Sequence, residues 1–121
     1  MKTIEDEILP TKTACTDSLK NVIDAMYVLN GRWRLALILC LVQSPKRFSE
    51  IQSEIKGISP KVLSSELKDL ELNFLIHRKV YPTTPVSIIY EASDYSHSLK
   101  SVLIELSSWG EQHRTKIKQS A

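Results

Sequence analysis

Residues 59–72 carry a short polar face whose side chains suit contact with a nucleic acid. Lys61, Ser64, Ser65 and Lys68 recur at helical intervals. They lie opposite an apolar row that we expect to face inward, formed by Val62, Leu63, Leu67 and Leu70. Serine hydroxyls can approach base edges closely, and Lys61 can reach a guanine or a phosphate. The pattern predicts a helix that contacts duplex DNA, although a merely solvated helix face has the same composition.

A second group of basic and hydroxyl side chains follows in residues 75–92. Arg78 and Lys79 lie in a predicted strand, and Thr83 and Thr84 lie at the tip of the hairpin that it begins. Such side chains suit contacts with phosphates or with the minor groove, which position a protein without reading the sequence. The alternative is that the strand cations only protect a sheet edge from aggregation.

Basic residues also stand near the start of two other predicted helices. Arg32 and Arg34 begin one of them, and Lys46 and Arg47 precede the next. Helix N-termini bind phosphates, but each of these charges also fits an ordinary surface residue. The full set of predicted DNA contacts is Arg47, Ser59, Pro60, Lys61, Ser64, Ser65, Lys68, Arg78, Lys79, Thr83 and Thr84.

The sequence offers no pattern for catalysis or metal binding. His77, His97 and His113 are far apart and combine with no motif of carboxylates or cysteines. There is no glycine-rich loop to hold phosphates, and no spacing suits zinc. We therefore expect no enzyme activity, no metal and no cofactor.

The two cysteines have different surroundings. Cys40 lies inside an apolar run, and we expect it to be an inert core thiol. Cys15 precedes the first predicted helix, whose N-terminus would favour the thiolate, whereas Asp17 opposes that shift. A sensor role for Cys15, toward oxidants or electrophiles, is a hypothesis. Two irregularly spaced cysteines form no disulfide scaffold, so we expect a cytoplasmic protein with reduced thiols.

The order of the elements explains how these side chains would be presented. Predicted helices cover residues 16–29, 32–42, 49–55, 59–72 and 94–118, and predicted strands cover residues 75–81 and 86–92. Ser49 and Gln52 form a capping box at the third helix, and Ser59 and Pro60 open the fourth. Helix, tight turn at Gly57, helix and hairpin are the plan of a winged helix-turn-helix. The expected fold is therefore mostly α with a small β-hairpin.

The first and last predicted helices carry apolar stripes that one small domain need not cover. We expect these stripes to form a homodimer, which would read a palindromic operator. The alternative is that both complete the monomer core. Trp33 and Trp109 are expected to be core or interface anchors. The predicted interface consists of Leu19, Val22, Ile23, Leu99, Val102, Leu103, Leu106 and Trp109.

The composition and length of the chain limit the classes of protein to which it can belong. The chain has 121 residues, 42% hydrophobic and 25% charged, with a formal charge of +2. Outside residues 1–9, 15 basic residues face 11 acidic ones, so DNA binding would need a focused patch. No secretory signal is visible, and the longest apolar run, residues 35–42, is too short to cross a bilayer. We expect an N-terminal arm at 1–14, one domain at 15–118 and a tail at 119–121.

A series of short segments resembles the HxlR family of bacterial transcriptional regulators. The segments are LNGRWRL at 29–35, KRFSEI at 46–51, GISPKVL at 57–63, LKDLE at 67–71 and VYPTTPV at 80–86. Ile89-Tyr90 and Trp109-Gly110 match the wing and the last helix of that family, and the resemblance covers about residues 15–113.

The resemblance implies a dimeric winged-helix regulator related to the MarR group. In that family the N-terminal and C-terminal helices build the dimer. The helix that begins at Ser59 would be the recognition helix, and residues 81–86 would be the wing tip. In some members a cysteine at the place of Cys15 senses oxidants or electrophiles, so an oxidant or a small molecule is a candidate inducer. Two other function classes stay open, a thiol-based sensor and a winged-helix module that binds proteins.

Overall fold

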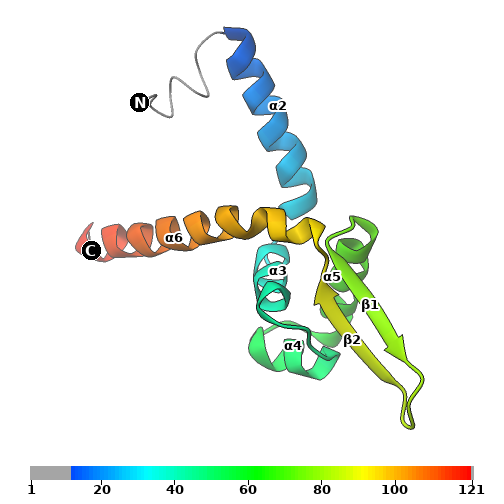
Figure 1. Ribbon diagram of the computed structural model, residues 1–121. Helices are drawn as coiled ribbons and strands as arrows, with labels where there is room; N and C mark the ends of the chain where they lie inside the picture. The colour runs from blue at the N-terminus through cyan, green and yellow to red at the C-terminus, as the bar shows by residue number, and fades with distance from the viewer. Residues whose placement is uncertain (1–11, 121) are drawn as a thin grey trace. The chain divides into compact units, whose positions relative to one another are not determined.

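The computed structural model describes residues 12–120, with side chains from residue 16 onward. The chain divides into two compact units, Met1–Gly31 and Arg32–Ala121. In the first unit the described residues form one helix, α2 (Lys12–Leu29; Figure 1). The predicted start at Thr16 or Asp17 is wrong, because residues 12–15 hold no glycine or proline that would stop the helix from extending. The predicted end is confirmed, since Gly31 has a φ of 122°.

The second unit contains the other helices and the hairpin. Its elements are α3 (Arg34–Gln43), α4 (Phe48–Glu54), α5 (Pro60–Leu72), β1 (Ile76–Tyr81), β2 (Ser87–Ala92), η1 (Tyr95–Leu99) and α6 (Lys100–Ser120). The only sheet among the described residues is the two-stranded one formed by β1 and β2. The predicted class, a mostly α winged helix-turn-helix with a small β-hairpin, is confirmed.

The core of this unit gathers around α3. Its most deeply buried side chains are Leu37, Ile38, Leu41, Ile51, Leu63, Leu67, Leu70 and Ile76. Burial of one such side chain contributes roughly 1.5–3 kcal/mol, so this cluster holds α3, α4, α5 and β1 together. The predicted inward position of Val62 is wrong, because it is 38% exposed. It lies roughly 100° around the helix from Leu63, outside the buried row.

Local hydrogen bonds fix where the two helices of the helix-turn-helix begin. The Val62 N–H donates to the Ser59 hydroxyl at 3.2 Å, which confirms the predicted cap of α5. The predicted capping box at Ser49 is wrong, because α4 begins one residue earlier. The Arg47 N–H donates to the Glu50 carboxylate at 2.9 Å. An ionised carboxylate is a stronger acceptor than a neutral side chain, which accounts for this choice of cap.

The turn between α4 and α5 requires a glycine. Gly57 has a φ of 91°, a conformation that residues with a side chain rarely adopt. A Cβ at this position would lie 3.7 Å from Cη2 of Trp33, so the half-buried indole packs against the turn. Trp33 therefore acts as an anchor within its own unit.

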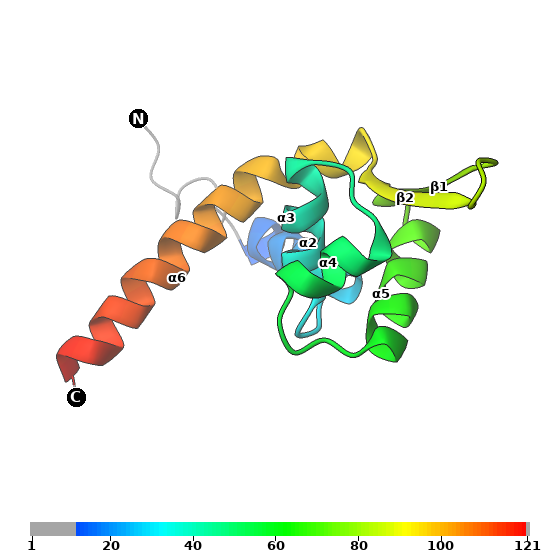
Figure 2. The same cartoon turned by 90° about the horizontal axis from the view of Figure 1, so that it is seen from below.

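The hairpin is antiparallel and extends beyond the helices of its own unit, as two perpendicular views show (Figures 1 and 2). In its register Arg78 pairs with Tyr90 and Lys79 pairs with Ile89. At the tip the Thr83 N–H donates to the carbonyl of Tyr81 at 2.8 Å. The strands lie within one residue of the predicted starts, Leu75 and Val86. The hairpin therefore has the place and pairing of the predicted wing.

The last helical segment differs from its prediction in the first turn. Residues 95–99 form the short 3-10 helix η1, and α6 follows it. The Ser96 N–H donates to the Ser93 hydroxyl at 3.1 Å, and both serines are buried.

Among the described residues, no single helix has both the length and the apolar composition to cross a membrane. Residues 16–29 and α3 meet that criterion only when they are added together.

Candidate nucleic-acid interface

The outer face of α5 presents the predicted contact residues to solvent. Lys61, Ser64, Ser65 and Lys68 are all exposed, on the opposite side of the helix from the buried leucines. Ser59 and Pro60 at the start of the helix are exposed as well. The structure therefore gathers these six predicted residues along one accessible helix.

One wing residue joins that face. Ser64, Lys68 and Glu71 of α5 line a hollow of about 250 Å³ together with Arg78 of β1 and Tyr90 of β2. Leu67 forms its floor. Because side chains alternate between the faces of a strand, Arg78 points toward α5. Basic and hydroxyl side chains of α5 and a basic side chain of the wing therefore border one hollow, together with the acidic Glu71.

Lys79 lies on the other face of the wing. Its Nζ is 2.6 Å from Oε1 of Glu91, and the hydrogen bond to this carboxylate raises the pKa of Lys79. The sequence treats Arg78 and Lys79 as equivalent candidates, but the structure does not. The charge of Lys79 is already compensated by a partner within the wing.

The wing tip exposes both predicted threonines. Thr83 and Thr84 lie between β1 and β2 and are open to solvent. The Thr83 hydroxyl donates to the carbonyl of Pro85 at 2.7 Å. This bond uses the proton of the hydroxyl and leaves its oxygen free to accept. Thr83 is therefore better suited to accept a hydrogen bond than to donate one to a phosphate.

Of the four basic residues near helix starts, only Arg47 is exposed without a charge or ring partner in the structure. Arg32 lies over the ring of Trp33, 4.6 Å from its centroid. Lys46 donates to the carbonyl of Cys40 at 2.7 Å and lies 3.6 Å from the Glu54 carboxylate. These interactions give both side chains a partner in the protein itself, which the sequence could not indicate.

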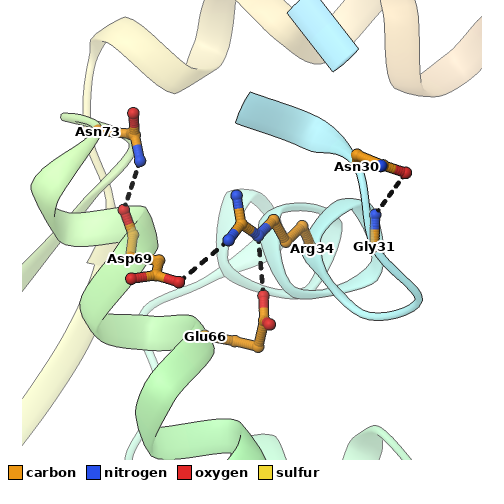
Figure 3. A network of polar contacts seen from close by, with 6 residues as sticks. All are labelled: Asn30, Gly31, Arg34, Glu66, Asp69 and Asn73. Carbon is orange, nitrogen blue, oxygen red and sulfur yellow. Dashed lines mark hydrogen bonds and ion pairs between the residues drawn. The ribbon is translucent and has the colours of Figure 1, made fainter. Parts of the chain in front are cut away.

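The fourth of these residues, Arg34, bridges to α5. Its Nε donates to Oε2 of Glu66 at 2.9 Å, and its Nη2 donates to Oδ2 of Asp69 at 3.0 Å (Figure 3). The guanidinium is mostly shielded from solvent, with 18% of the side chain exposed. The suggestion that Arg34 meets a DNA phosphate is therefore wrong, because its Nε and Nη2 groups already donate to carboxylates of α5.

Cys40 has the character of an inert thiol. It is 5% exposed, and its Sγ donates to Oε2 of Glu54 at 3.1 Å. Burial, followed by this hydrogen bond, raises the pKa of the Cys40 thiol to about 11. Thiolates are the reactive form, so Cys40 is protected from oxidants. The backbone of Cys15 lies within α2 rather than before it, and its side chain is outside the described residues.

Apolar side chains are exposed on α2 and on α6. Leu19, Val22 and Ile23 are 59–66% exposed. On α6, Val102, Leu106 and Trp109 are 42–61% exposed, whereas Leu103 is buried. Leu99, at the end of η1, is half-buried. Trp109 stacks on His113 with the ring centroids 4.9 Å apart.

Among the described residues, no three His, Cys, Asp or Glu side chains come close enough to hold a metal ion.

These features define a class of protein: a winged helix-turn-helix protein with an exposed second helix and a basic residue of the wing beside it. The chain belongs to the HxlR-like helix-turn-helix family, whose model matches residues 28–118. The resemblance seen in the sequence is thereby confirmed. The protein is a DNA-binding transcriptional regulator of the HxlR type.

Individual relatives agree with this assignment. The HTH-type transcriptional regulator YodB of Bacillus subtilis (strain 168) is 40% identical over 88 residues, which cover 73% of this chain and 79% of YodB. The redox regulator HypR in its reduced form matches with a TM-score of 0.77 and 25% identity over 82% of this chain and 98% of HypR. The quinone-bound form of YodB from B. subtilis matches with a TM-score of 0.66 and 33% identity, over 77% and 98% of the two chains.

Proposed function

We propose that this regulator binds operator DNA as a homodimer, with α5 in the major groove and the wing on the backbone or in the minor groove. The observation that carries the proposal is the hollow shared by Ser64, Lys68 and Arg78. It joins the exposed face of α5 to the wing, so one duplex can meet both. Residues of α5 would read bases, whereas Arg78 and Arg47 would meet phosphates.

The exposed apolar faces support the dimer. Leu19, Val22 and Ile23 on α2 are exposed at helical spacing, and so are Leu106 and Trp109 on α6. Isolated exposed apolar residues are ordinary, but contiguous rows of them mark interaction surfaces. A two-fold dimer doubles the DNA contacts and pairs two half-sites about one helical turn apart.

Selection from a random duplex pool at physiological salt tests this proposal. We expect an enriched palindrome, and light scattering should give twice the mass of one chain. Lys61→Ala should weaken binding to the selected operator and relax the preference at one position of each half-site. Weak binding without enrichment, lost as salt rises, would instead indicate electrostatic attraction only and favour a module that binds proteins.

A sensor function for Cys15 is the second proposal. It is supported by the similarity to HypR, which is a redox regulator, and to YodB, which has been solved with bound quinone. The burial of Cys40 leaves Cys15 as the candidate thiol. Diamide or benzoquinone should change the operator affinity of the wild type but not of Cys15→Ser. An equal change in both proteins would reject this role.

We propose that residues 15–118 contain the DNA-binding and dimerisation functions, and that the protein acts in the cytoplasm as a regulator without catalytic activity. The family and the relatives, which are transcriptional regulators, support this view. Operator binding by a protein that comprises only residues 15–118 should equal that of the full chain.

A further inference from the structure

The contacts of Arg34 join the first turn of α3 to two successive turns of the recognition helix. Arg34 is the first residue of α3, and its two carboxylate partners, Glu66 and Asp69, are three residues apart on α5. The bonds of 2.9 and 3.0 Å leave from different nitrogens of one planar group. We call this set of three residues the Arg34 bridge (Figure 3).

The Arg34 bridge holds one flank of α5, and the wing contacts another. Residues three apart on a helix share a flank, and this flank differs from the buried row of leucines. On the other side, Ser64 and Lys68 line the hollow with Arg78. Apolar packing restricts how far α5 can move from the core but tolerates small rotations. The two hydrogen bonds on this flank are directional, so they oppose rotation of α5 about its own axis.

The end of α5 is tied to the same flank. The Asn73 amide donates to the backbone carbonyl of Asp69 at 2.8 Å, so the last turn is closed where the bridge attaches (Figure 3). The helix is therefore capped at both ends, by the Asn73 amide and by the Ser59 hydroxyl. A fixed rotation determines which side chains the outer face directs toward a base edge.

The bridge also has an electrostatic role. Helix α5 contains two lysines and three acidic residues, so its own net charge is −1. A negative helix near phosphates is repelled. Arg34 compensates the charge of Glu66 or Asp69, so that α5 and Arg34 together carry no net charge. The lysines then dominate the outer face.

We propose that Arg34 is a positioning residue for DNA recognition: through Glu66 and Asp69 it sets the rotation of the recognition helix, without touching DNA. The proposal rests on the proposed function, since it requires that α5 reads DNA. Positioning and electrostatic compensation make opposite predictions when the carboxylates, instead of the arginine, are changed.

The decisive variant is therefore Glu66→Gln combined with Asp69→Asn. It removes the ionic bridge while it makes α5 more positive. Positioning predicts a lower ratio of operator affinity to scrambled-duplex affinity, by about tenfold, which corresponds to about 1.4 kcal/mol. Affinity for scrambled duplex should be unchanged or higher. A ratio equal to or above that of the wild type would overturn the proposal.

Arg34→Gln provides the second arm. It should lower the same ratio without changing the slope of affinity against salt, whereas loss of a phosphate contact lowers that slope by about one. Arg34→Lys should recover only part of the ratio, because an ammonium lacks the planar fork that serves two acceptors. A lower slope for Arg34→Gln would make it a DNA contact and reject the positioning role.

Controls separate this result from simple loss of stability. Lys118→Gln near the end of α6 removes one positive charge far along the chain from α5 and should leave the ratio unchanged. All measurements are made well below the thermal midpoint of each protein. If the double variant does not fold, the single variants Glu66→Gln and Asp69→Asn are measured in its place. If the wild type itself shows no operator preference, the proposed function fails, and the positioning role fails with it.

Discussion

Lys46 and Tyr90 exchange both of their backbone hydrogen bonds. The Lys46 N–H donates to the Tyr90 carbonyl at 2.9 Å, and the Tyr90 N–H donates to the Lys46 carbonyl at 2.8 Å. This isolated bridge attaches the segment between α3 and α4 to β2 of the wing. A lone two-stranded hairpin is marginal in water, so this attachment helps to hold the base of the wing against the helices.

The Lys46 side chain should stabilise the same junction. It donates to the Cys40 carbonyl at 2.7 Å and pairs with Glu54. Because hydrogen bonds from a charged donor contribute about 1.5–3 kcal/mol, we expect Lys46→Ala to lower the free energy of unfolding by about that amount in urea denaturation. Lys56→Ala, an exposed lysine in the next turn, is the matched control. An equal loss in both variants would show that the Lys46 contacts contribute nothing specific.

Arg78 and Lys79 should behave differently in DNA binding despite their adjacent positions. Arg78→Ala should weaken binding to all sequences alike and reduce the salt slope by about one, because a phosphate contact is lost. Lys79→Ala should change both quantities less, since Lys79 is paired with Glu91. Titrations of operator and scrambled duplex at several salt concentrations measure both effects. The reverse order would mean that the outer face of the wing meets DNA.

The sequence predicted the elements better than the contacts between them. Helix periodicity, the Ser59 cap and the Asn30-Gly31 stop are local signals, and each is confirmed. The apolar row predicts an inward position for Val62 as well as for Leu63, Leu67 and Leu70, but Val62 is exposed. Its exposure depends on the angle at which α5 packs, and no local pattern contains that angle.

The side-chain partners of the candidate site depend on residues that are distant in the chain. Arg34 meets Glu66 across 32 positions, and nothing near Arg34 in the sequence indicates that pairing. Lys79 and Glu91 meet because of the hairpin register, which is set by the turn. A sequence can therefore nominate charged residues for DNA contact. Only the fold shows which of them are already paired.

The raised pKa of Cys40 gives a dependence of stability on pH. The pKa of the thiol rises from 9.0 to about 11 in the folded protein. Above pH 9 the unfolded chain loses the proton while the folded chain keeps it. The stabilising contribution is therefore complete below pH 9 and is lost as pH rises toward about 11.

Urea denaturation of two proteins in a Cys15→Ser background, with and without Cys40→Ala, isolates this contribution. The difference in stability between them should shrink from pH 8 to pH 11, since other titrating groups are common to both. A difference that stays constant with pH would show that the Cys40 thiol titrates alike in both states. In native protein at pH 8, iodoacetamide should leave Cys40 unmodified.

Leu106 on α6 provides a direct test of the dimer. It is 45% exposed, beside Val102 and Trp109, with which it lines a shallow hollow of about 450 Å³. In a two-fold interface each substitution acts twice. Loss of two buried leucines corresponds to roughly 3–6 kcal/mol, so Leu106→Glu should weaken dimerisation by roughly a hundredfold or more.

Light scattering and binding to full and half operators measure the effect. Ser107→Glu adds the same charge at the neighbouring exposed position and should remain dimeric. If Leu106→Glu remains dimeric and binds the full operator as the wild type does, the dimer surface does not include this part of α6.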